Sequence, residues 1–66
     1  AALPALSPRE REILRLVAQG LSNSAIAGAL GLSDHTAKRH VQNILVKLNL
    51  RTPAAAAALA VRSGLL

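Results

Sequence analysis

Apolar residues recur along this chain at the three- and four-residue spacing of amphipathic helices, and no segment shows the alternation typical of a β-strand. Together with the capping residues at the ends of these segments, the pattern predicts four helices. They are expected at residues 8–19, 23–30, 34–48 and 53–63. The sequence therefore predicts an all-α fold, a four-helix bundle formed by residues 7–66, with residues 1–6 as the end of a linker.

The first and fourth predicted helices share a start signal, a capping hydroxyl followed by proline at the first helical position, in Ser7-Pro8 and Thr52-Pro53. Glu10 completes a capping box with Ser7. Glu10 also falls inside the apolar arc of its helix, where an unpaired carboxylate would be costly. The capping box is the favoured explanation of Glu10, and an ion pair with a basic residue such as Arg51 is the alternative.

The second and third predicted helices are joined by only three residues, Gly31-Leu32-Ser33. Two short helices connected by a tight turn that contains glycine form the helix-turn-helix signature. The later helix of the pair has one apolar stripe, which consists of Ala37, Val41, Ile44 and Leu48. We expect this stripe to pack on the core and to leave the rest of the helix accessible.

Another face of the same helix carries Lys38, Arg39 and Gln42, whose side-chain types are those that most often read base edges in the major groove. A solvated polar face on an ordinary helix would look the same, but the helix-turn-helix context and the basic charge of the chain favour DNA contact. We therefore predict that residues 34–48 form a recognition helix and that these three side chains contact bases. His35 shares this face, and both phosphate contact and simple solvation stay open for it.

Helix N-termini attract anions, so polar residues there can bind DNA phosphates in addition to capping the helix. The candidates are Ser22, Asn23, Ser33 and Thr36. Lys47 either complements the dipole at the end of its helix or holds the DNA backbone, and the sequence does not separate the two. His40 is expected to pack at the edge of the apolar stripe. It lies about 140° around the helix from His35, so the two cannot share a metal, and no metal site or cofactor is expected.

The formal net charge is +5, from eight Lys and Arg residues against three Asp and Glu residues. The absence of aromatic residues argues against an RNA or single-strand binder, because such proteins stack bases on aromatic rings. An enzyme is not expected, because Glu10 and Glu12 point to nearly opposite sides of their helix and no nucleophile has a positioned base.

The longest apolar run, residues 54–61, is far shorter than the ~20 residues of a membrane span, and we expect a cytoplasmic protein.

The last predicted helix is almost entirely alanine, which allows another helix to approach closely. One of its faces must pack on the core, and the apolar surface left over suggests self-association. The expected contacts are Ala54, Ala57, Ala58 and Val61. High helix propensity alone explains the alanines almost as well.

The order of these motifs resembles the LuxR/GerE-type DNA-binding domain, the C-terminal output module of many bacterial regulators, including NarL- and FixJ-like response regulators. The matching segments are Leu6-Ser7-Pro8-Arg9-Glu10-Arg11-Glu12, Gly20-Leu21-Ser22-Asn23 with Ile26-Ala27, Ser33-x-x-Thr36-x-Lys38-x-His40-Val41, Asn43-Ile44-Leu45-x-Lys47-Leu48, and the closing Ala57 and Gly64-Leu65-Leu66. The resemblance covers residues 6–66, and it implies a four-helix domain that contains a helix-turn-helix.

The resemblance also implies a function, sequence-specific binding of double-stranded DNA in transcription regulation, with base contacts at Lys38, Arg39 and Gln42. Such domains commonly dimerise through the last helix, here residues 53–63, on paired half-sites. Activators of this kind also touch RNA polymerase, and an N-terminal domain would receive the signal. The alternative is a helical protein-interaction module that docks its basic face on an acidic partner, and it predicts indifference between DNA sequences.

Overall fold

The computed structural model describes residues 6–64, which form four α-helices and no strand. The helices are α1 (Pro8–Ala18), α2 (Asn23–Leu30), α3 (Asp34–Lys47) and α4 (Pro53–Arg62). All four predicted helices are confirmed, with bounds that differ from the expected ones by one residue at most. The boundaries predicted for the linker and the domain fall partly on residues 1–5 and 65–66, outside the described residues.

Each helix begins where the sequence placed a capping side chain. The Ser7 hydroxyl accepts the backbone N–H of Glu10 at 3.2 Å, and Glu10 Oε1 accepts the Ser7 N–H at 2.9 Å, so the predicted capping box is confirmed. The other three caps each accept the backbone N–H three residues later at 3.1 Å, and they are Ser22, Ser33 and Thr52. Because capping is a local interaction, it fixes the first turn of every helix from the sequence alone.

The turn between α2 and α3 depends on Gly31, which has a φ of +69° in the left-handed region. This conformation reverses the chain and lets the Leu32 N–H donate to the Ala27 carbonyl at 2.8 Å. A side chain at Gly31 would meet no atom within 4 Å, so backbone conformation and not space favours glycine there. Because the turn is short, it fixes the orientation of α3 relative to α2, and with it the positions of their two N-termini.

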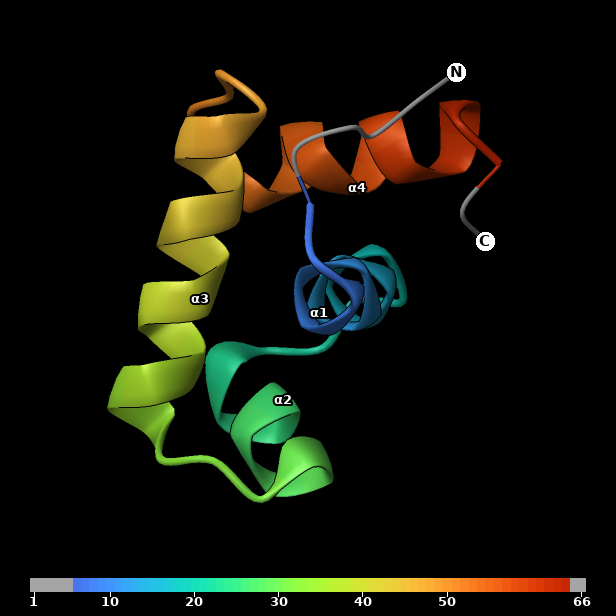
Figure 1. The fold of residues 1–66 in the computed structure, drawn as a ribbon. Helices are drawn as coiled ribbons and strands as arrows, with labels where there is room; N and C mark the ends of the chain where they lie inside the picture. The colour runs from blue at the N-terminus through green and yellow to red at the C-terminus, as the bar shows by residue number, and fades with distance from the viewer. Residues whose placement is uncertain (1–5, 65–66) are drawn as a thin grey trace.

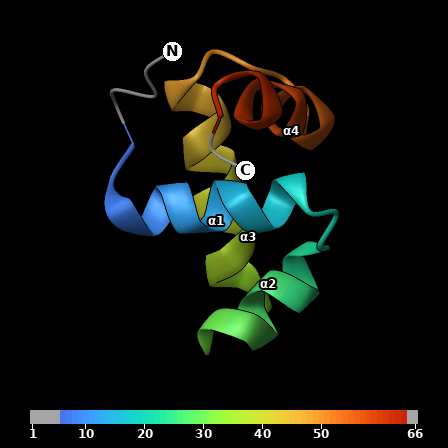
Figure 2. The ribbon, with the colours of Figure 1, turned by 90° about the vertical axis from the view of Figure 1, so that its right-hand side faces the viewer.

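The core forms around α1, which lies between α4 and α2 and crosses α3 (Figures 1 and 2). The largest fully buried side chains are Ile13, Leu14, Ile26 and Ile44. The predicted stripe of α3 is confirmed, since Ala37, Val41 and Ile44 are buried and Leu48 is half-buried. This packing anchors α3 by one face only and leaves its opposite face to solvent.

Candidate nucleic-acid interface

The exposed face of α3 brings together the side chains that the sequence predicts for base contact. Lys38, Arg39 and Gln42 are all exposed, and together with exposed His35 they line one open depression on the surface. Among residues 6–64, none of these four forms an ion pair or side-chain hydrogen bond within the molecule. Their donors and acceptors are therefore available to a ligand. We call these four residues the reading face.

The reading face is held rigidly, because α3 is fixed at its start as well as along its buried stripe. The Ser33 hydroxyl accepts the Thr36 backbone N–H at 3.1 Å and donates to Thr36 Oγ1 at 2.9 Å. Thr36 is half-buried, whereas Ser22, Asn23 and Ser33 are exposed at the N-termini of α2 and α3. The Ser22 and Ser33 hydroxyls satisfy the third N–H group of each helix, and within residues 6–64 the first two N–H groups of each helix have no partner, which makes both ends suitable for an anion.

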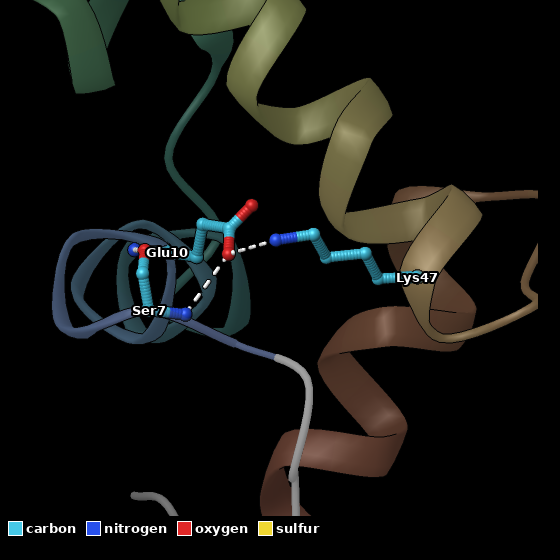
Figure 3. A network of polar contacts seen from close by, with 3 residues as sticks. All are labelled: Ser7, Glu10 and Lys47. Carbon is cyan, nitrogen blue, oxygen red and sulfur yellow. Dashed lines mark hydrogen bonds and ion pairs between the residues drawn. The ribbon is translucent and has the colours of Figure 1, made fainter.

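At the opposite end of α3, Lys47 reaches back to α1 and pairs with Glu10 (Figure 3). Lys47 Nζ lies 2.8 Å from Glu10 Oε1, the same oxygen that accepts the Ser7 N–H. Glu10 is only 7% exposed, so its charge is compensated inside the fold. An ion pair therefore does accompany the capping box of Glu10. Its cation is Lys47, however, so the predicted partner Arg51 was wrong. Arg51 itself is exposed.

These contacts set the charge state of Glu10. The hydrogen bond from Lys47, followed by the one from the Ser7 backbone, lowers the pKa of Glu10 below its ordinary value, although burial acts in the opposite direction. A group whose pKa is lowered by folding stabilises the folded state above its unfolded pKa and loses that contribution as the pH falls through its folded pKa. Glu10 therefore couples the stability of this domain to acid pH.

We expect Glu10→Gln to lower the free energy of unfolding at pH 7 by about 1–2 kcal/mol, because a charge-assisted hydrogen bond is lost while the amide oxygen can still accept from Ser7. The difference from the unchanged chain should shrink as the pH falls below the ordinary pKa of a glutamate and through the lowered pKa of Glu10, because the protonated carboxyl no longer forms the ion pair. Urea denaturation over this pH range measures it. Glu12→Gln is the matched control, because the 3.4 Å contact of Glu12 with Arg9 is an exposed ion pair that contributes little. Parallel pH curves for the Glu10 variant and the unchanged chain would contradict this assignment.

The two histidines lie apart, as the sequence indicated: His40 is half-buried and His35 is exposed on the reading face. Within residues 6–64, no cluster of three or more His, Cys, Asp or Glu residues could hold a metal ion. No helix among the described residues has the length and apolar character to cross a membrane.

The alanine-rich helix α4 packs mainly on α1, and its Ala56 and Ala60 are buried in the core. The residues predicted for self-association lie on the rest of its surface. Ala54 and Ala58 are exposed, Ala57 is half-buried and Val61 is 60% exposed. We call these four residues the α4 patch. Its spacing of three, one and three residues forms a continuous stripe along the helix.

A helix-turn-helix with a basic, unobstructed face on its second helix defines a DNA-binding domain of the transcription-regulator class. The model of the family of bacterial regulatory proteins named luxR matches residues 4–60, and the chain belongs to this family. The family consists of DNA-binding transcription regulators and is not an enzyme family.

The most similar relatives include response regulators. The nitrate/nitrite response regulator NarP of Escherichia coli is 49% identical over 51 residues, which cover 77% of this chain and 24% of NarP. The probable transcriptional regulatory protein NarL of Mycobacterium tuberculosis is 48% identical over 63 residues, 96% of this chain and 29% of that protein. The chain thus spans about a quarter of the length of the curated relatives it matches.

A solved structure shows the same fold. The crystal structure of the response regulator ChrA, from a heme-sensing two-component system, matches 100% of this chain and 33% of ChrA, with a TM-score of 0.84 and 39% sequence identity. The four-helix fold of this chain therefore also occurs as one part of ChrA, a longer response regulator.

Proposed function

We propose that this chain is the output domain of a bacterial response regulator and that it binds double-stranded DNA sequence-specifically through α3. The observation that carries the proposal is the reading face, in which Lys38, Arg39 and Gln42 lie side by side on a helix anchored from behind. The α3 helix of 14 residues is roughly 21 Å long, and a major groove about 12 Å wide admits a helix of this kind. Lysine and arginine favour guanine, and glutamine favours adenine.

Contacts to the DNA backbone would fix the position of α3. Ser22, Asn23, Ser33 and Thr36 would place the N-terminal N–H groups of α2 and α3 against phosphates, with His35 beside them. We also propose a backbone contact for Lys47, whose side chain is 42% exposed. This contact is weaker than that of a free lysine, because Glu10 already holds the ammonium group.

Two copies would bind paired half-sites through the α4 patch. The patch is small and alanine-rich, so it buries little area and the isolated dimer would be weak. Because the relatives are about four times as long, we propose that residues 1–6 link this domain, residues 7–66, to an N-terminal signal-receiving domain. The whole protein would act in the cytoplasm and touch RNA polymerase at promoters.

Selection from a pool of random-sequence duplexes tests the proposal, with the affinity of the enriched duplex followed against salt concentration. We expect two related half-sites about one helical turn apart, and an affinity that falls steeply with salt as phosphate contacts release counterions. A steep salt dependence without enrichment would reduce the reading face to a nonspecific basic surface. Absence of binding at low salt would overturn the DNA function and favour docking of the basic face on an acidic protein.

A further inference from the structure

Two large apolar side chains are exposed among residues 6–64, Val46 at 79% and Val61 at 60%. Val61 belongs to the α4 patch, but Val46 lies on α3 and belongs neither to the buried stripe nor to the reading face. Folding does not account for it. Valine is a weaker helix former than alanine, lysine or glutamine, and its exposed methyl groups gain nothing from the core.

The position of Val46 on α3 aligns it with the reading face. At 100° per residue, Val46 lies about 20° from Arg39 and 40° from Gln42 around the helix axis, whereas it lies about 180° from the buried Ala37. The rise from Arg39 to Val46 is roughly 10.5 Å, less than the ~12 Å width of the major groove. Arg39, Gln42 and Val46 are separated by three and then four residues. Recognition helices of the homeodomain type contact bases from positions with the same separation.

We infer that Val46 is a further specificity-determining residue, which packs its methyl groups against the 5-methyl group of a thymine in the major groove. The inference rests on the proposed function. Valine has no side-chain donor or acceptor, so it cannot recognise the polar edges of bases. The thymine methyl is the one apolar group that a base presents in this groove. The contact would complement the polar reading by Arg39 and Gln42 with an apolar reading further along the helix.

The test replaces each thymine of the selected duplex, one at a time, by deoxyuridine, which lacks only the methyl group. For the unchanged 66-residue chain we expect one position in each half-site where this replacement weakens binding about fourfold, the effect of one methyl group leaving an apolar contact. In Val46→Ala this sensitivity should disappear at that position and stay unchanged at all others. Gln19→Ala, at an exposed position at the end of α1 that lies outside both the reading face and the α4 patch, should retain the sensitivity and serves as the control.

Thermal unfolding separates a specificity effect from a folding defect. Val46→Ala should unfold at the same or a slightly higher temperature, because alanine is the better residue for an exposed helical position. Specific binding with no thymine sensitive to loss of its methyl group, or with equal sensitivity in Val46→Ala, would overturn the inference and leave the proposed function intact. In that case Val46 would be assigned to a protein contact. A chain that selects no duplex at all would overturn both.

Discussion

Ile44→Ala is expected to leave most of this domain unfolded at 25 °C. Ile44 is 1% exposed and lies on the buried stripe by which α3 packs on the core. Truncating a fully buried isoleucine to alanine costs about 2–5 kcal/mol, because apolar contact is lost and a cavity remains. A single core in a domain of this size rarely supplies more than about 3–5 kcal/mol. Urea denaturation followed by circular dichroism measures the loss.

The chain provides its own control two residues further along α3. Val46→Ala removes apolar atoms from the opposite, exposed face of the same helix and should change the free energy of unfolding by less than about 0.5 kcal/mol. Ile44→Val should fall between the two, at about 0.5–1.5 kcal/mol. Equal effects of Ile44→Ala and Val46→Ala would mean that α3 does not pack by the face described here.

The helices could be predicted to within one residue because their boundaries depend on neighbouring residues. The hydroxyls of Ser7, Ser22, Ser33 and Thr52 cap helices through N–H groups only three residues away. The reading face could be predicted for a similar reason, since a helix of known period places Lys38 and Arg39 away from Ala37. The same periodicity places Val46 on the exposed side, and its wheel position is the signal by which this residue can be found from sequence.

The partner of Glu10 could not be predicted in the same way. A carboxylate in an apolar arc signals that a cation must approach, but not which one. Lys47 lies 37 residues away in the chain, and only the crossing of α1 and α3 brings its ammonium to Glu10. Arg51 is four residues further on, beyond the left-handed turn at Asn49, where φ is +57°. Long-range polar contacts depend on helix packing, which local sequence does not contain. The DNA contacts and the dimer stay predictions for a related reason. Each depends on a second molecule, whose position neither the sequence nor the fold of one chain determines.

Arg39→Ala is expected to relax base preference at one position of each half-site, with a loss of about 1–3 kcal/mol of discrimination there. Arg39 is exposed on the reading face, so its truncation would remove the proposed base contact without disturbing the core. Affinities for the selected duplex and for its three single-base variants at each position, measured at one salt concentration, give the discrimination directly. The other positions should keep their preferences, because distant contacts contribute almost independently.

Arg15→Ala separates the loss of a base contact from the loss of a charge. Arg15 is also exposed but lies on α1, outside the reading face, and its removal lowers the net charge by the same amount. It should weaken binding slightly and equally for all duplexes, through long-range electrostatics alone. If Arg39→Ala also weakened every duplex equally and reduced the salt dependence, Arg39 would hold a phosphate, and specificity would depend on Lys38, Gln42 and the apolar contact of Val46.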